Sequence, residues 1–420
     1  MAKVVPFRGL RYALSRIDVG QVATQPYDKI SKEMQDRYYA LHPNNIIRIV
    51  LGKATASDSF SDSVYTRAAA TLKEWRAAGV LENRGEPAFF VYYQRFTIPG
   101  TSEVRTRKGF IGLGLLEDYS NRVVYPHERT LTGPKEDRLE LLRHTRTHFE
   151  QIFMLYEDPA QQIDQRLDQA IAGSKPDIDV QDEYGVMHTL WTISDPGLLE
   201  FIQKDMSVKK LIIADGHHRY ETALAYRDEI GRDEPGPHQF MAMTFFNLDA
   251  PGLTILPTHR VISKLPGFDP KAFMVRASEL FEAGETGVNI GVFSDHGNLS
   301  VRLHLKPGLV LDELLPDLSP KLRELDVVIL HRLLIEKCLG ISEEAVKRES
   351  YITYYRDKEA AMNQVRSGAA NVAFLLNPTS LHQMRDLAYE GNVMPQKSTD
   401  FYPKVLSGLV MYSLDEKGKS

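Results

Sequence analysis

Apolar positions recur along the chain with two different periods, which predicts a protein that contains both strands and helices. Strand-length apolar runs occupy residues 46–52, 87–98, 106–119, 152–158, 188–194, 209–215, 239–248, 351–356 and 371–377. Between them, apolar residues return every three or four positions, as on the buried face of a helix. Such segments are 61–78, the stretch that begins near Pro134, 196–205, 216–230, 325–340, 358–367 and 378–391. We therefore predict an α+β or mixed α/β fold, with a hairpin that turns at Pro99 and Gly100.

The composition is that of an ordinary globular protein. Hydrophobic residues make up 43% of the 420 residues and charged residues 25%, which disfavours a disordered or fibrous chain. Lys and Arg number 51 against 56 Asp and Glu, for a net charge of −5. Because nucleic-acid and anionic-membrane binding need clustered Lys and Arg, neither is expected. No period of 20–50 residues repeats, so a solenoid is not expected either.

Cysteine content and hydropathy bear on the compartment. The single cysteine, Cys338, excludes an intramolecular disulfide and a multi-cysteine metal site within one chain. The first residues lack the apolar core of a secretory signal, and no stretch approaches the ~20 apolar residues of a membrane-spanning helix. The expected location is the cytoplasm.

The segment IADGHHRYETA carries the strongest candidate chemistry. An apolar strand ends at Asp215 and Gly216, and helical spacing begins at once. The first N–H groups of a helix are unpaired and positive, so they bind anions. His217, His218 and Arg219 add cationic or hydrogen-bonding side chains at an end where they disfavour the helix itself. This pattern indicates a phosphate site. The alternatives are a helix cap with solvent-facing histidines, or a metal site at the histidines.

Six motifs resemble, in order, those of a widespread family catalogued as a domain of unknown function. They are PFRGLR near the start, QPYDKIS (25–31), YPHERT (125–130), DGHHRYETA (215–223), LPTHRV (256–261) and MPQKSTDFYPK (394–404). Members of that family are linked to ATP-dependent kinase activity toward free serine, the SerK type. The resemblance therefore implies ATP and Mg²⁺ as cofactors and a small-molecule acceptor.

The GxHRYxxA core also resembles the nucleotide-phosphate motif of the ParB/sulfiredoxin superfamily. On this resemblance, Gly216, His217, His218 and Arg219 hold the nucleotide phosphates. Asp215 lies beside them and positions magnesium or the acceptor.

The same resemblance implies a ParB/sulfiredoxin-like nucleotide-binding core that is elaborated by additional strands and helices. The catalytic region is expected over 1–265, and a C-terminal α/β region that closes the site over 266–420. His217 stands where sulfiredoxin has its reactive cysteine, and Cys338 lies in an apolar helical segment. Sulfinic-acid reduction is therefore not expected, and the helix-turn-helix of ParB proteins is not recognisable.

A second group of candidates lies in segment 122–134, which follows neither period and is predicted to be a long loop. His127, Glu128 and Arg129 are adjacent there. A carboxylate flanked by His and Arg stays ionised and can act as a general base or magnesium ligand; a solvated ion pair is the alternative. Asp28, in the proline-shaped turn of QPYDKIS, is another candidate base or the centre of an Asx-turn.

Two further segments carry candidate anion ligands. Arg260, beside His259, offers a planar bidentate donor to a phosphate or a carboxylate, and a buried structural salt bridge is the alternative. Lys397 and Ser398 lie in a proline-bounded loop, where a lysine can clamp a phosphate or simply be exposed.

Phosphoryl transfer needs a phosphate cradle, a metal and a carboxylate that orients or deprotonates the acceptor. The residues alone indicate a phosphate-binding enzyme, and the family resemblance implies an ATP-dependent kinase for free L-serine. The alternatives are a ParB-like nucleotide-binding regulatory protein and a phosphohydrolase or nuclease with the same cradle. The candidate catalytic carboxylates are Asp28, Glu128 and Asp215, and the candidate substrate-binding residues are His127, Arg129, His259 and Arg260.

Overall fold

A computed structural model describes residues 1–83, 85–128, 133–284 and 290–415. The chain divides into two compact units. Unit 1 comprises Met1–Tyr125, Leu131–Leu253 and Pro403–Ser420, and unit 2 comprises Pro126–Thr130 and Thr254–Tyr402.

These ranges differ from the predicted regions 1–265 and 266–420, which stay a prediction about functional organisation. The main segment of unit 2, Thr254–Tyr402, begins with β13 (Thr254–Leu256) and ends with β20 (Asp400–Tyr402), and these two strands pair with each other.

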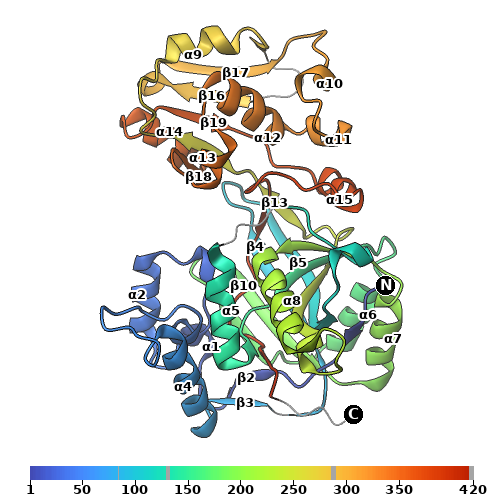
Figure 1. Cartoon of the computed structure of the whole chain (residues 1–420). Helices are drawn as coiled ribbons and strands as arrows, with labels where there is room; N and C mark the ends of the chain where they lie inside the picture. The colour runs from blue at the N-terminus through green and yellow to red at the C-terminus, as the bar shows by residue number, and fades with distance from the viewer. Residues whose placement is uncertain (84, 129–132, 285–289, 416–420) are drawn as a thin grey trace. The chain divides into compact units, whose positions relative to one another are not determined.

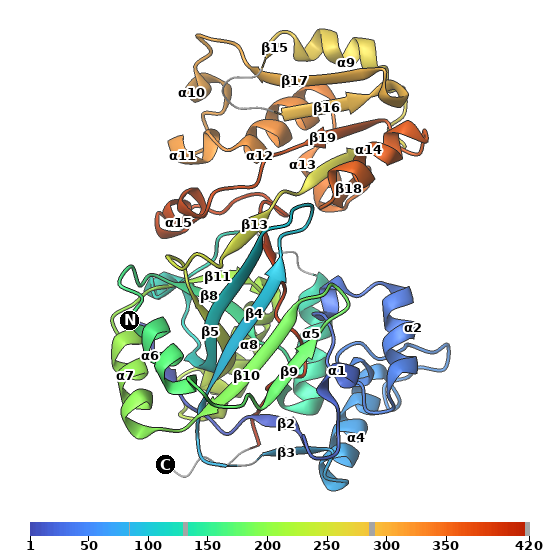
Figure 2. The ribbon, with the colours of Figure 1, turned by 180° about the vertical axis from the view of Figure 1, so that it is seen from behind.

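Unit 1 is built on a nine-stranded mixed sheet. Its strands lie in the order β6 (Val124–Tyr125), β11 (Leu211–Asp215), β8 (Ile152–Tyr156), β12 (Phe240–Asn247), β5 (Val104–Leu115), β4 (Phe89–Thr97), β10 (Met187–Ile193) and β9 (Ile178–Gln181), and β1 (Val4–Val5) pairs with β5. Two pairs, β6 with β11 and β8 with β12, are parallel, and the others are antiparallel. The predicted hairpin is β4 and β5 (Figure 2). Together with the helices, this sheet confirms the mixed α/β fold.

Helices cover this sheet, and further helices follow one another in the N-terminal part of the chain. The two helices α5 (Gly133–Thr145) and α8 (His217–Gly231) pack side by side on one face (Figure 1). The remaining helices are α1 (Val19–Val22), η1 (Tyr27–Lys29), α2 (Lys32–Leu41), α3 (Ile47–Val50), α4 (Val64–Ala77), η2 (Tyr119–Asn121), α6 (Gln162–Ile171), α7 (Pro196–Met206) and η3 (Pro237–Gln239). Two short sheets join β2 (Leu10–Tyr12) to β3 (Leu81–Asn83) and β7 (Thr147–His148) to β21 (Tyr412–Ser413).

Segment 46–52 was predicted as a strand, and this prediction is wrong because the segment forms the helical turn α3. The side chain of Asn45 accepts a hydrogen bond from the backbone N–H of Ile47 at 3.0 Å and so begins the turn. A short, fully buried apolar run has no period that separates strand from helix. Segment 122–134 is also not a loop throughout, since it includes β6 and the first residues of α5.

Unit 2 has a six-stranded antiparallel sheet. Its order is β15 (Phe281–Ala283), β17 (Leu299–Leu305), β16 (Ile290–Ser294), β19 (Val372–Leu375), β14 (His259–Ile262) and β18 (Ile352–Tyr355). Helix α14 (Lys358–Arg366) packs on this sheet through Ala361 and Val365. The other elements are α9 (Pro270–Ala277), η4 (Asp295–Gly297), α10 (Leu311–Leu314), α11 (Pro320–Arg323), α12 (Asp326–Ile329), the π-helix η5 (Leu330–Cys338), α13 (Glu343–Lys347) and α15 (Leu381–Tyr389).

In the described part of the chain, no helix combines the length and the apolar character that crossing a bilayer requires.

Candidate functional site

The turn between β11 and α8 places Asp215 and Arg219 against each other. Gly216 forms the N-cap of α8 with a φ of 96°, in the left-handed region. A Cβ at this position would lie 3.1 Å from Cζ of Arg219 and from Cδ1 of Ile152. Glycine is therefore required both by the backbone conformation and by the close approach of the arginine.

The carboxylate of Asp215 forms two ion pairs. Its Oδ2 lies 3.0 Å from Nη2 of Arg219, and its Oδ1 lies 3.3 Å from Nζ of Lys404. Both cations are largely buried, with 9% and 7% of their side chains exposed. Burial by itself raises the pKa of Asp215, but the charges of Lys404, Arg219 and Lys29 outweigh this effect and hold the pKa well below its usual range. Asp215 is therefore an anion throughout the neutral range.

A buried polar network holds Lys404 in place. The side-chain amide of Gln94 donates to the carbonyl of Lys404 at 2.7 Å, and Arg107 donates to the carbonyl of Pro403. The Arg107 guanidinium is itself buried against two neighbouring phenylalanine rings, 4.4 and 4.5 Å from their centroids. Burial lowers the pKa of Arg107 to about 9. The backbone at 403–404 is thus anchored, and the Lys404 side chain is directed to Asp215.

The N-terminal turn η1 belongs to the same cluster. Tyr27 donates its backbone N–H to Oε1 of Glu150 at 2.9 Å, and the Ser407 hydroxyl donates to the same oxygen at 2.7 Å. The ammonium of Lys29 lies 3.2 Å from Oδ2 of Asp28.

Arg219 connects this turn to Asp215. Burial lowers the pKa of Arg219, yet the carboxylates of Glu150, Asp215 and Asp28 more than offset this effect and raise it. Three carboxylates and three cations therefore lie within electrostatic reach of one another. We call them the Asp215 cluster: Asp28, Lys29, Glu150, Asp215, Arg219 and Lys404.

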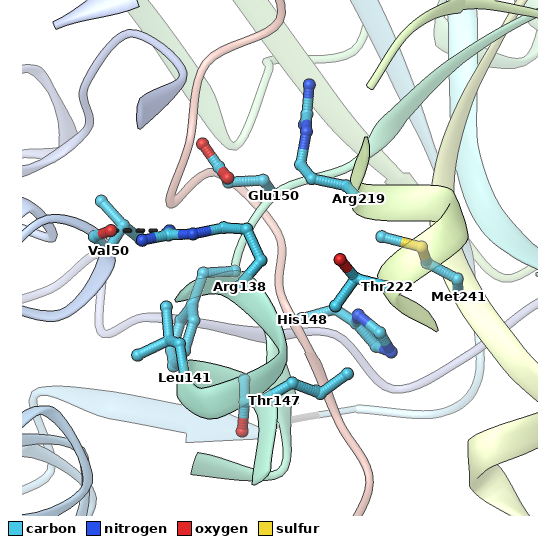
Figure 3. Close-up of a pocket in the computed structure, with 11 residues that line it drawn as sticks. Val50, Arg138, Leu141, Thr147, His148, Glu150, Arg219, Thr222 and Met241 are labelled. Atoms are coloured by element: carbon cyan, nitrogen blue, oxygen red, sulfur yellow. Dashed lines mark hydrogen bonds between the residues drawn. The ribbon is translucent and has the colours of Figure 1, made fainter. Parts of the chain in front are cut away.

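A pocket of unit 1 reaches this cluster. It holds about 400 Å³ of empty space, partly open to solvent, and its lining combines apolar residues such as Leu141 and Met241 with charged ones. Figure 3 shows Glu150 and Arg219 at one end of the pocket, and Arg138, which donates to the carbonyl of Val50 at 2.7 Å. The cluster is therefore accessible from a partly apolar cavity.

Both predicted histidines lie in the first turn of α8. His217 and His218 are partly buried, and they follow Gly216 directly. Their position agrees with the proposed phosphate cradle but does not by itself assign them a ligand.

A second set of predicted residues comes together in unit 2. The backbone N–H and the hydroxyl of Thr399 both donate to Oε1 of Glu128 at 2.8 Å. Nε2 of His127 lies 2.6 Å from the same hydroxyl, and the backbone N–H of Met394 donates to the carbonyl of His127 at 2.9 Å. The motifs YPHERT and MPQKST are thus neighbours in space. Arg129 lies outside the described residues.

Arg260 is fully buried in unit 2, with 1% of its surface exposed. It donates to the carbonyls of Thr258 and Lys397, the latter at 2.8 Å, and to Nε2 of His331 at 3.4 Å. Burial lowers the pKa of Arg260 to about 10, while Tyr354 and Glu128 counteract this effect. The hydrogen bonds go to carbonyls rather than to the carboxylate of a structural salt bridge.

The remaining predicted residues of unit 2 have defined surroundings. Nδ1 of His259 accepts the backbone N–H of Leu376 at 3.2 Å, and burial lowers the pKa of His259 to about 4. Its ring is therefore neutral, and it accepts a backbone hydrogen bond from the segment that follows β19. The Ser398 hydroxyl donates to the carbonyl of Pro395 at 2.5 Å, whereas Lys397 is exposed.

The predicted site residues thus fall into two clusters, one in each unit. Asp28 and residues 215–219 lie in unit 1, and His127, Glu128, His259, Arg260, Lys397 and Ser398 lie in unit 2. Sequence reasoning missed Lys29, Glu150 and Lys404 as members of the Asp215 cluster. Lys29 and Lys404 stood inside the motifs QPYDKIS and MPQKSTDFYPK, whereas Glu150 carries no local signal.

The described side chains around Asp215 do not form a metal site as they stand. Among the described residues, no group of three or more His, Cys, Asp or Glu side chains could hold a metal ion. Both oxygens of Asp215 already face cations. Asp215 as arranged here is therefore not a preformed Mg²⁺ site.

Comparison with known proteins places the chain in a family. This mixed α/β chain belongs to the family described as "Protein of unknown function (DUF1015)", whose model matches residues 4–362. No curated protein sequence matches the chain.

Solved structures show a distant likeness. A free serine kinase in complex with AMP is 14% identical with a TM-score of 0.35, over 70% of this chain and 88% of that chain. SbnI with C-terminal truncation from Staphylococcus aureus is 12% identical with a TM-score of 0.37, over 71% and 86%. A conserved hypothetical protein from Pyrococcus furiosus is 14% identical with a TM-score of 0.35, over 68% and 92%.

Proposed function

We propose that the protein is an ATP-dependent phosphotransferase that phosphorylates free L-serine to O-phosphoserine. The observation that carries the proposal is the ionised Asp215, which is held by Arg219 and Lys404 at the N-terminus of α8. The choice of serine rests on the resemblance of the six motifs to the free-serine-kinase family.

The Asp215 cluster supplies what phosphate binding requires. The first N–H groups of α8 point away from the helix and favour an anion. Lys29, Arg219 and Lys404 add positive charge near this turn, as their lowering of the pKa of Asp215 indicates. A triphosphate would compete with Asp215 for these cations. On binding it would draw the ammonium of Lys404 toward its oxygens and release one carboxylate oxygen.

Magnesium enters this proposal with the nucleotide. Mg²⁺ in kinases is held mainly by phosphate oxygens and one or two carboxylates. Asp215 becomes available as such a ligand only after Lys404 or Arg219 has turned to the phosphates. The ion would neutralise charge on the transferred phosphoryl group.

The acceptor needs a carboxylate that takes its proton. In the reaction, the serine hydroxyl oxygen forms a bond to the terminal phosphorus of ATP, the bond from that phosphorus to the bridging oxygen breaks, and ADP leaves. The hydroxyl proton passes to a carboxylate. Asp28 is our candidate for this base in unit 1, and Glu128 is our candidate in unit 2.

Phosphorus NMR of the purified full-length chain tests the proposal. The sample contains magnesium, ATP and a pool of free amino acids, and parallel samples replace ATP with ADP or omit serine. A phosphomonoester signal that requires both serine and a nucleotide supports the kinase. Release of inorganic phosphate alone would instead support the phosphohydrolase, and an unchanged nucleotide in every sample would contradict the proposal.

A further inference from the structure

Unit 2 contains a polar pocket of its own. It encloses about 420 Å³ of empty space, partly open to solvent. Its polar lining residues are Thr258, Arg260, Asp326, Asn377, Thr379, Gln383 and Ser398. The pocket therefore combines one cationic and one anionic side chain with several short neutral polar groups.

Arg260 is the cationic side of this pocket. Its side chain is buried, yet in the described part of the chain its hydrogen bonds go only to two carbonyls and one imidazole. These partners use three of the five N–H bonds of a guanidinium. No carboxylate among the described residues lies within 4.0 Å, and Glu128 acts on Arg260 only from farther away. A buried arginine normally has an anionic partner.

Asp326 is the anionic side. It begins α12 and is partly buried. Burial raises the pKa of Asp326, and its own backbone N–H is the only group that lowers it. Among the residues the structure describes, no Lys, Arg or His lies within ion-pair distance of this carboxylate. Asp326 also favours the start of a helix, but that role does not require a position in the same pocket as a buried arginine.

We propose that this pocket binds the zwitterionic head group of a free α-amino acid, with the α-carboxylate on Arg260 and the α-ammonium on Asp326. A zwitterion satisfies both charges at once, whereas a phosphate or a simple carboxylate satisfies only Arg260. The hydroxyl and amide groups of Thr258, Thr379 and Asn377 suit a short polar side chain. The inference deepens the proposed function, on which it rests only for serine as the ligand.

Calorimetric titration of the full-length chain without nucleotide tests this pocket. The probes are L-serine, L-lactate, which lacks the ammonium, and ethanolamine, which lacks the carboxylate. Because a charged hydrogen bond contributes about 1.5–3 kcal/mol, L-serine should bind about tenfold or more tightly than either analogue.

Substitution of Asp326 separates charge recognition from general binding. Asp326→Asn should weaken L-serine by about tenfold or more and leave L-lactate affinity within about twofold. Asp317→Asn is the matched control, since the exposed Asp317 belongs to the same unit and pairs with Arg332 at 2.9 Å. This control should leave the affinity for every probe unchanged.

The possible outcomes separate this inference from the proposed function. Equal affinity for L-serine in the wild-type chain and in folded Asp326→Asn would overturn the amino-acid pocket, as would L-lactate that binds as tightly as L-serine. Binding of L-serine with no phosphate transfer would contradict the kinase and support the pocket. Phosphate transfer with an unchanged KM for serine in Asp326→Asn would support the kinase and contradict the pocket.

Discussion

The Asp215 cluster of unit 1 and the polar pocket of unit 2 differ in whether their buried charges have partners within the chain. In the Asp215 cluster, carboxylates and cations meet in ion pairs, and the pKa of Asp215 is lowered. In the unit 2 pocket, Arg260 and Asp326 have no ion-pair partner among the described residues, and the pKa of Asp326 is raised. A ligand of the first site must displace an internal partner, whereas a ligand of the second supplies the missing one. The first arrangement suits a highly charged triphosphate, and the second suits a small zwitterion.

The largest effect is expected from Asp215→Asn. This change leaves Arg219 and Lys404 buried without their carboxylate, and breaking a buried pair typically costs about 3–5 kcal/mol. Because Asp215 is 20% exposed, we expect the lower part of that range in urea unfolding. If Asp215 also acts in phosphate transfer, kcat should fall by about 10³-fold.

The control for this prediction is a second carboxylate that pairs with an arginine of α8. Asp118 pairs with Nη2 of Arg227, a buried arginine two turns further along α8, at 3.1 Å. Asp118→Asn should cost less stability, because Arg227 keeps Asp228 as a partner at 2.8 Å, and it should leave kcat unchanged. An equal loss of activity in both variants would show that the Asp215 cluster matters only for folding.

The pH dependence of the unfolding free energy should reveal the lowered pKa of Asp215. The pKa of Asp215 is lower in the folded chain than its unfolded value of about 3.9, so its stabilisation is present above that value and is lost as the pH falls through the folded pKa. The difference in unfolding free energy between wild type and Asp215→Asn should therefore be constant near neutral pH and shrink below about pH 4. A difference that already changes between pH 6 and 8, measured by urea unfolding, would show that another group titrates.

An intermediate effect is expected from His259→Ala. The substitution leaves the N–H of Leu376, a buried residue just after β19, without its acceptor, which costs about 1–3 kcal/mol. Because the pKa of His259 is lowered to about 4, the neutral ring stabilises the chain most at pH values above the unfolded value of about 6.5. Thermal unfolding at pH 7.5 measures this loss. An increased KM for serine with unchanged stability would instead assign His259 to substrate binding.

The smallest effect is expected from Asp326→Asn in the absence of ligand, and it has the opposite sign. The pKa of Asp326 is raised, so its ionisation destabilises the folded chain above its unfolded pKa. Removal of the charge should raise stability at pH 7 by less than about 1 kcal/mol. The gain should vanish below about pH 3.9. A loss of stability at pH 7 would indicate that Asp326 stabilises the N-terminus of α12 and is not kept for binding a ligand.

The sequence predicted the elements well where period and length agree. The strand at 209–215, the glycine turn and the helix from 217 follow from local signals, and the structure has them as β11, Gly216 and α8. It failed at 46–52, where a buried apolar run has no readable period. Local signals also could not show that Glu150 and Lys404 approach the turn at 215–219, because such contacts depend on the packing of distant segments.

For the candidate site too, local sequence signals identified some features and the fold was needed for others. Motif residues were identified individually, but their grouping into two clusters required the fold. Asp28 lies within electrostatic reach of Arg219, and Glu128 within that of Arg260, although sequence spacing does not encode either proximity. Asp326 drew no attention because a single acid at a helix start is common, and only the buried Arg260 in the same pocket makes it notable.

Titration with magnesium and ATP tests most directly whether the Asp215 cluster is a phosphate site. The samples are wild type, Lys404→Met and the control Lys209→Met, whose ammonium pairs with Asp205 at 3.1 Å in the same unit. Lys404→Met should weaken ATP binding by about tenfold or more, as expected for loss of a charged hydrogen bond to phosphate. Lys209→Met should change it less than about twofold. Unchanged ATP affinity in folded Lys404→Met would contradict the account.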